Sequence, residues 1–565
     1  MYFLGLSFRF FNADRCERRG ITPMTSWIRT RPEYLTRAEL LGGILATGAL
    51  AACGGSTSPP AGPSACAATL ATLPDFKQIF SDPAFNTLDK ATLAALFDRA
   101  DKLKGNDAGY FEQSAQKLQF SHIITSIPPS GIVIRLPGTY TFAGDLTWTP
   151  AATLSSAVTI ASSDVTLNLG GYTLTASVPD ISWQTTGIFV GTSANTALDN
   201  VNIFNGTIAN TTEYGIFADG VCGLDISHVT VTGVSIQNLN IDLLTPAGIF
   251  VSESLNVAIT YCSITNMTVK ADSSAGIFLL TTIGASVSNC QTRLLENLDG
   301  AVIGFSCIKS VNVNTSNCTA QNLKTQFGGN IKGSGHTVLG FCPILCLSLN
   351  YSDCSASNLT GSCDDVHGIS VFLDGLVSVE RFTADTIVDG PPPYNTGAKA
   401  TGVEVYGVGI TVKDSSASNI TANNPQDLQA TGFSAWGLTI GFDNCTATNV
   451  VVNGKGNGTG FGWAPDPRPL FAHPAIGVAY TNCTANACAV GFDTFYHQNS
   501  VWTSPKTTNC ATPILVNPTE QRTLTCDGCS ECAPGGKLNP PGYSAGPPPY
   551  YYETLTNVEI GNIFL

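Results

Sequence analysis

The stretch Gly248-Ile249-Phe250-Val251 is one copy of a short pattern that decides the fold. The pattern begins at Gly187-Ile188-Phe189-Val190 and returns at Gly215-Ile216-Phe217 and at Gly276-Ile277-Phe278-Leu279. Weaker copies begin at Gly300, Gly335, Gly368, Gly402, Gly432, Gly460 and Gly491. Successive copies start 24 to 35 residues apart, which is a period typical of repeat proteins.

A second pattern follows the first in each repeat. Its clearest copy is Cys262-Ser263-Ile264-Thr265-Asn266, and alternating pairs such as Val311-Asn312-Val313 indicate strands. The other residues in the cysteine slot are Val229, Cys290, Cys318, Cys354, Phe382, Ser415, Cys445 and Cys483. A slot shared by Cys, Val and Phe points inward, so we predict buried thiols at 262, 290, 318, 354 and 445. The asparagine four residues later is expected to stack as a turn ladder.

A single unit of this size cannot bury its own apolar face, so equivalent strands must stack in parallel. Parallel crossovers favour a right-handed coil. We therefore predict an all-β fold, a right-handed parallel β-helix solenoid of roughly 11–13 rungs. The chain resembles the pectin-lyase-like superfamily, with residues 131–147, 165–174 and 201–208 as its first three rungs. The resemblance specifies the fold and leaves the function open, because lyases, hydrolases, epimerases, adhesins and phage spikes share this scaffold.

The amino terminus predicts export. Residues 40–53 form an apolar run too short to span a membrane, behind a flank of arginines. Leu50-Ala51-Ala52-Cys53 resembles the bacterial lipobox, which implies lipidation at Cys53. We assign 1–53 to leader and lipobox, 54–66 to a flexible tether, 67–125 to a small helical cap, 130–510 to the β-helix and 511–565 to a Cys/Pro-rich cap and tail. An ordinary cleaved signal and a start at Met24 are the alternatives.

Composition narrows the function classes. Charged residues make up 12% of the chain, about half the usual share, and the net charge is −14. No basic patch exists to neutralise phosphates, so nucleic acid is excluded as a partner. The acidic balance also opposes long-range capture of acidic polysaccharides or anionic membranes. Contact with a membrane is expected through the lipid anchor alone.

The densest candidate for catalysis is Asp364-Asp365-Val366-His367-Gly368. Paired carboxylates beside an imidazole suit acid–base work on a sugar. The superfamily's polygalacturonase-type set is incomplete here, whereas Asp365 and His367 match two positions of the Asp-Pro-His-Glu signature of mannuronan epimerases. Neighbouring rungs add Arg381, Glu404 and Tyr406, and stacking is expected to place Asp365, Glu404 and Tyr406 on one face. The alternative is that the aspartates cap a loop and His367 packs at a turn.

A second candidate lies in a Pro-rich insertion of a late rung. It holds Trp463, Asp466 and Arg468, and aromatic rings in such loops suit stacking on pyranose faces. The alternative is a structural lid. Near the carboxyl end we expect disulfides rather than a metal site. The candidate disulfide residues are Cys510, Cys526, Cys529 and Cys532.

The sequence predicts a lipid-anchored protein of the cell envelope, at the outer membrane or cell surface, which associates with extracellular polysaccharide. Modification of that polysaccharide by a lyase, epimerase or hydrolase reaction is left open. The alternative is a non-catalytic adhesin or structural surface protein. No cofactor and no metal site are predicted, and calcium has no supporting motif.

Overall fold

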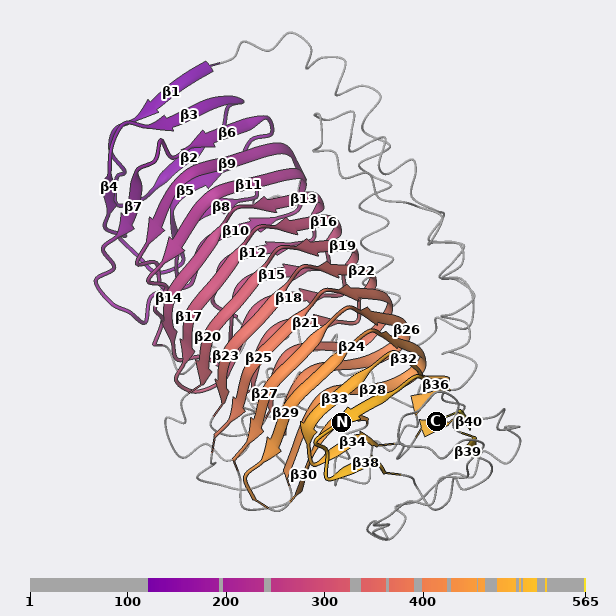
Figure 1. The fold of residues 1–565 in the computed structure, drawn as a ribbon. Coiled ribbons are helices and arrows are strands. Elements are labelled where there is room, and N and C mark those ends of the chain that lie inside the picture. The colour runs from indigo at the N-terminus through magenta and orange to yellow at the C-terminus, as the bar shows by residue number, and fades with distance from the viewer. Residues whose placement is uncertain are drawn as a thin grey trace, which may run out of the picture.

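The computed structural model describes thirteen stretches of the chain. These are residues 120–192, 197–237, 245–325, 337–361, 365–390, 399–423, 428–454, 456–462, 475–493, 497–498, 501–515, 524–525 and 563–564. Within them the chain is all β, and 38 strands pair in parallel in one elongated stack (Figure 1). The described part contains no helix able to cross a bilayer.

Three parallel sheets run the length of the stack, and each coil of the chain adds one strand to each sheet. The A sheet contains β2 (Ile132–Ile134), β5 (Ser155–Ile160), β8 (Thr185–Val190), β10 (Tyr214–Asp219), β12 (Ala247–Ser252), β15 (Ser273–Leu280), β18 (Ala301–Ile308), β21 (Val338–Ile344), the first halves of β24 (Asp365–Glu380), β26 (Lys399–Lys413) and β28 (Leu428–Asp443), then β30 (Gly456–Gly462), β34 (Val490–Asp493) and β38 (Thr512–Leu515).

The B sheet receives the next strand of each coil. It contains β1 (Phe120–Ile124), β3 (Gly138–Phe142), β6 (Val165–Asn168), the first parts of β9 (Leu198–Ala209) and β11 (Val221–Thr232), β13 (Leu255–Thr260), β16 (Ile283–Ser288), β19 (Val311–Ser316), β22 (Leu347–Ser352), the second halves of β24, β26 and β28, then β31 (Ala475–Ile476), β32 (Ala479–Thr481), β35 (His497–Gln498) and β36 (Val501–Thr503).

The C sheet completes the coil. It contains β4 (Leu146–Trp148), β7 (Thr173–Ala176), the second parts of β9 and β11, β14 (Ser263–Val269), β17 (Gln291–Asn297), β20 (Thr319–Thr325), β23 (Ser355–Gly361), β25 (Thr383–Asp389), β27 (Ser416–Ala422), β29 (Thr446–Val452), β33 (Thr484–Cys488) and β37 (Lys506–Thr508). A separate pair joins β39 (Leu524–Thr525) to β40 (Ile563–Phe564). Counted from β2 to β37, the described residues form thirteen coils, and the predicted parallel β-helix is confirmed.

The glycine that opens each A-sheet pattern stands where the chain is most crowded. A Cβ on Gly368 would lie 2.5 Å from the carbonyl oxygen of Gly402 in the next coil, and one on Gly402 would lie 2.5 Å from the Ala417 Cβ. Two copies of the predicted pattern lie elsewhere in the structure. The strand register pairs Ile277 with Phe305 and Phe305 with Phe341, so the glycines of these coils are 304 and 340 instead of 300 and 335.

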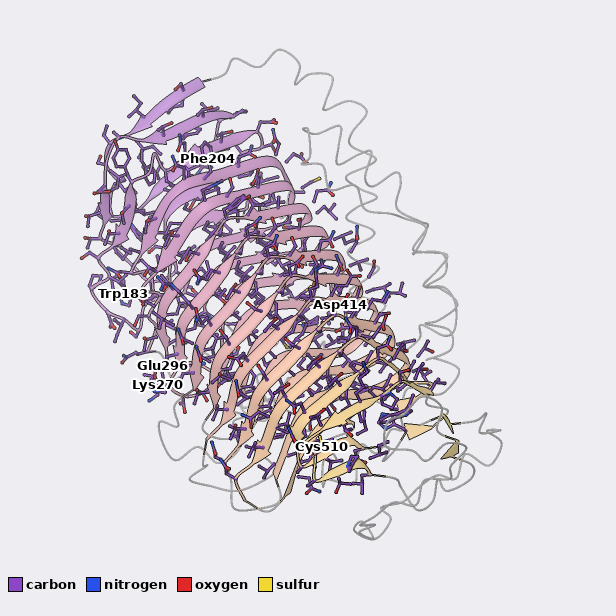
Figure 2. The ribbon with its side chains drawn as sticks, in the orientation of Figure 1. Trp183, Phe204, Lys270, Glu296, Asp414 and Cys510 are labelled. Atoms are coloured by element: carbon purple, nitrogen blue, oxygen red, sulfur yellow. The ribbon has the colours of Figure 1, made fainter. Side chains whose placement is uncertain are left out.

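The residue after each of these glycines points into the core. Buried apolar side chains follow one another from coil to coil along this inward column. They are Ile188, Ile216, Ile249, Ile277, Phe305, Phe341, Ile369, Val403, Phe433, Phe461 and Phe492. Figure 2 shows side chains filling the stack along its length, where Phe204, Asp414 and Cys510 mark successive levels. The hydrophobic side chains of this continuous core are the main stabilising contribution.

The cysteine slot and the asparagine ladder both behave as predicted. The thiols at 262, 290, 318, 354 and 445 are buried and form no disulfide. The Sγ of Cys262, for example, lies 3.4 Å from the Thr260 carbonyl oxygen. Asn419 and Asn449 both have φ of 55°, a left-handed conformation that asparagine tolerates. The Asn449 amide donates to the Asn419 side-chain oxygen at 2.8 Å.

Several predicted segments fall outside the described residues. These are the leader and lipobox (1–53), the tether (54–66), most of the cap region and Cys526, Cys529 and Cys532. The last residues of the cap region, Phe120–Ile124, form β1 of the B sheet. The Cys510 thiol lies 3.6 Å from the carbonyl oxygens of Ala485 and Thr508.

Candidate functional site

The outer face of the A sheet carries a polar cluster in coils nine to eleven. Ile369 and Val403 belong to the inward core, so the side chains that alternate with them point outward. In register, Ser370 of β24 pairs with Glu404 of β26, and Glu404 pairs with Ser434 of β28. Neighbouring strands lie about 4.8 Å apart, so these outward side chains stand next to one another.

Glu404 is the centre of the cluster. Its Oε2 accepts a hydrogen bond from the Ser370 hydroxyl at 2.9 Å and lies 3.3 Å from Nδ1 of His367. Its Oε1 forms an ion pair with the Nζ of Lys399. Glu404 and His367 are buried, and the Lys399 side chain is 15% exposed. Asp365, also buried, is in register with Lys399 at the start of the same two strands.

Burial and charge set the protonation of the cluster. Burial alone raises the pKa of Glu404, but the charges of Lys399 and His367 and the hydrogen bond from Ser370 outweigh it and lower that pKa to about 2. Burial lowers the pKa of His367 to about 4, although the Glu404 carboxylate opposes the shift. At neutral pH the site therefore holds an ionised Glu404–Lys399 pair beside an uncharged imidazole.

Aromatic rings form one border of the cluster. Phe372, Tyr406 and Trp436 occupy one outward column, with ring centroids 5.2 Å apart for the first pair and 5.7 Å apart for the second. The Nζ of Lys399 lies 5.6 Å from the Trp436 ring centroid, a cation–π distance. Burial raises the pKa of Tyr406 to about 12, so its phenol stays protonated.

Two further hydroxyl groups belong to the same face. Thr401 pairs in register with His367, and Ser434 pairs with Glu404. Both side chains are buried, and neither Thr401 Oγ1 nor Ser434 Oγ hydrogen-bonds to any described residue. Leaving a buried hydroxyl unsatisfied costs roughly 1–3 kcal/mol, so their position calls for an explanation.

The corner beside this face is where the coils differ most in length. Connections from the A to the B sheet and from B to C are mostly short, as from Ser252 to Leu255, and a clear exception is the A-to-B connection from Gly462 to Ala475. Connections from C to A are the long ones in several coils. They run from Thr232 to Ala247, from Thr325 to Val338 and from Asp389 to Lys399. The long connections therefore enter the A sheet at the edge from which Asp365 and Lys399 begin their strands.

Of the predicted site residues, the structure brings His367 into contact with Glu404, and it places Asp365 and Tyr406 on the same face, toward opposite ends of the same strands. Arg381 is elsewhere. It lies at the corner between the B and C strands, where it binds the exposed Asp353 carboxylate through Nε at 2.6 Å and Nη2 at 2.8 Å. Asp364, Trp463, Asp466 and Arg468 lie outside the described residues.

Sequence reasoning missed Lys399, Ser370 and Trp436. The signal was present, because aligning Gly368, Gly402 and Gly432 places Ser370, Glu404 and Ser434 at the same offset in three repeats. Among the described residues, no group of three or more His, Cys, Asp or Glu side chains is arranged to hold a metal ion.

No protein-family model and no curated protein matches the chain. Solved structures with similarity include the A-module of a mannuronan C-5 epimerase from Azotobacter vinelandii, at 11% identity and a TM-score of 0.35, covering 70% of this chain and 91% of that one. A tailspike protein of E. coli bacteriophage HK620 in complex with a pentasaccharide has 12% identity and a TM-score of 0.34, with 66% and 71% covered. The catalytic domain of a GH87 alpha-1,3-glucanase has 9% identity and a TM-score of 0.30, with 74% and 66% covered. At these values no activity or site residue transfers to this chain.

Proposed function

We propose that this protein binds extracellular polysaccharide on the outer face of its A sheet, across coils nine to eleven. The observation that carries the proposal is the contact of His367 and Lys399 with Glu404, and of Lys399 with the Trp436 ring, on the face where Asp365 and Tyr406 also stand. Burying ions in this way is an expensive arrangement for a fold that needs only its inward column. Convergent polar groups beside aromatic rings are typical of a carbohydrate site.

Modification of the bound glycan is the second candidate, and one contact favours it. The imidazole of His367 is uncharged at neutral pH, and its Nδ1 lies 3.3 Å from Glu404. An uncharged imidazole held by a carboxylate is able to accept a proton from a substrate, and the pKa of about 4 makes His367 a weak base for this step. A binding protein without catalysis is the alternative, and the products of the reaction distinguish the two.

The predicted export signal extends the proposal to the location of the protein. Lipidation at Cys53 would attach the protein to the cell envelope and leave the β-helix outside, where polysaccharide is available. The cysteine variant Cys53→Ala tests this directly. We expect the unaltered protein to partition with membranes in detergent extraction, and the variant to be released as soluble protein. Membrane association that survives the substitution would contradict the lipid anchor.

The binding proposal is tested with the full chain on a glycan array, followed by titration of the best polysaccharide. We expect Trp436→Ala to weaken binding about tenfold, equivalent to about 1.4 kcal/mol. The matched control is Tyr261→Ala, because Tyr261 is an exposed aromatic residue at a corner between the B and C strands. Assays for reducing ends and unsaturated products on the same polysaccharides test modification. Absence of binding to every glycan, or equal losses in both variants, would overturn the proposed site.

A further inference from the structure

This step rests on the proposed function and names the class of glycan. We infer that the outer face of the A sheet takes an uncharged, hydroxyl-rich polysaccharide and rejects uronate polymers. The argument has three parts: the charge of the face, the commitment of its cation, and the buried hydroxyl groups that no described residue satisfies.

The described strands of the A sheet carry far more negative than positive charge. Their acidic residues are Asp219, Asp365, Glu404 and Asp493, whereas Lys399 is the single Lys or Arg within the A-sheet portions of these strands. His367 adds no positive charge at neutral pH, because its pKa is lowered to about 4 by burial. A carboxylate on every sugar of a bound chain would therefore face like charges.

The one cation is already engaged. The Nζ of Lys399 is paired with Oε1 of Glu404 and lies over the Trp436 ring. Recognition of a carboxylate needs a cation or several donors directed at its oxygens. Taking Lys399 for that purpose would leave Glu404 buried with its charge uncompensated, which is strongly destabilising. The Lys399–Glu404 ion pair is therefore expected to stay formed when a glycan binds, and to hydrogen-bond only to neutral groups of that glycan.

The buried hydroxyls supply the positive argument. Thr401 Oγ1 and Ser434 Oγ flank the Glu404–His367 pair in register and bond to no described residue. A hydroxyl group both donates and accepts hydrogen bonds, as does each hydroxyl of a sugar. Both side chains are 0% exposed, so a pyranose unit reaches them only when this face opens; it then satisfies both hydroxyls and places its apolar face toward Tyr406 and Trp436.

The charge of the whole chain acts in the same direction. The net charge of −14 repels a polyuronate before contact, so the acidic polymer is disfavoured at long range as well as in the site. A neutral polysaccharide meets neither barrier.

The test is a matched pair of polymers titrated against the unaltered full chain. Polygalacturonate is compared with its own carboxyl-reduced product, which keeps the linkages and loses the charges. A β-1,3-glucan and a galactomannan extend the neutral series, and alginate extends the acidic one. We expect at least one neutral polymer to bind about tenfold or more tightly than either uronate polymer, at both low and high ionic strength.

Two variants sharpen the result. In Glu404→Gln the ion pair is lost and Lys399 is released, so uronate binding is expected to rise relative to neutral binding. In Ser434→Ala neutral binding is expected to fall several-fold. Tighter binding of the unaltered protein to polygalacturonate or alginate than to every neutral polymer would overturn the inference while leaving the proposed function standing. Binding to no polymer of either series would overturn the proposed function, and this inference with it.

Discussion

One outward column of the A sheet changes its chemistry half way along the stack. In coils three to six it holds Phe189, Phe217, Phe250 and Phe278, whose neighbouring ring centroids lie 5.4, 5.2 and 4.8 Å apart. In coils nine to eleven the same column holds Ser370, Glu404 and Ser434. The backbone register is continuous between the two halves through Ser306 and Cys342.

The inward column beside it does not change in this way, since it stays apolar from Ile188 to Phe492. The parallel stack therefore keeps its inward column apolar and leaves this outward column free to vary. The aromatic half adds ring contacts that stabilise the outer face. The polar half places an ion pair and an imidazole where the fold gains nothing from them. A feature that the fold does not need is where function is expected.

The largest expected effect tests the distinction between inward and outward positions. Phe433 is fully buried in the core, with its ring stacked 4.8 Å from Phe461. Phe433→Ala should lower the free energy of unfolding by about 3–5 kcal/mol. Phe250→Ala, on the half-buried outer column, should cost less than half of that. Urea unfolding followed by circular dichroism measures the free energy of unfolding of both variants. Equal losses would contradict the distinction between inward and outward positions.

The next effect is that the two halves should respond to pH in opposite directions. Glu213 adjoins Tyr214 in the aromatic half, and burial raises its pKa to about 7 from an ordinary 4.5. A raised carboxyl pKa contributes stability at low pH that is lost as the pH rises from 4.5 to 7. His367 in the polar half has its pKa lowered from 6.5 to about 4, so stability is lost as the pH falls through that window.

The pKa shift of Glu213 and that of His367 each correspond to about 3 kcal/mol of folding free energy. Glu213→Gln should therefore raise the melting temperature at pH 7.5 and not at pH 4. His367→Gln should flatten the fall in melting temperature between pH 6.5 and 4. The Glu404 window lies lower, between 4.5 and about 2, and is separable from that of His367. Melting curves across the pH range check both variants. If both variants changed the pH dependence of the melting temperature in the same direction, the prediction that the two halves respond oppositely to pH would be wrong.

The fold could be predicted because a parallel in-register stack converts sequence offset directly into position. Cys262 and Cys445 occupy the same inward slot although they are far apart in the chain. The predicted positions were wrong where the sequence did not reveal the strand register. Gly300 resembled the repeated glycine, but only the pairing of Ile277 with Phe305 shows that Gly304 holds the crowded position.

The candidate site was predictable to the same extent. Asp365, Glu404 and Tyr406 were expected on one face, and the register places them there. Lys399 belongs to no motif, and its role appears only when its register with Asp365 is known. Arg381 was expected in the site as a cation on a neighbouring rung. However, it sits at a corner with φ of 51°, past the end of its strand, and no pattern marks that turn away from the site.

The smallest expected effect sharpens this last contrast between two cations. Arg381 pairs with Asp353 in solvent, since their side chains are 50% and 43% exposed, and such pairs are screened by water. Arg381→Ala should leave the melting temperature and glycan binding unchanged within error. Lys399→Ala removes the same charge from the outer face of the A sheet, where it leaves the buried Glu404 uncompensated. That variant should lower the melting temperature and weaken glycan binding. The two variants are prepared in the same way and compared by calorimetry and by glycan titration. If Arg381→Ala weakened binding and Lys399→Ala did not, the glycan would bind at the corner between the B and C strands. The proposed site on the outer face of the A sheet would then be wrong.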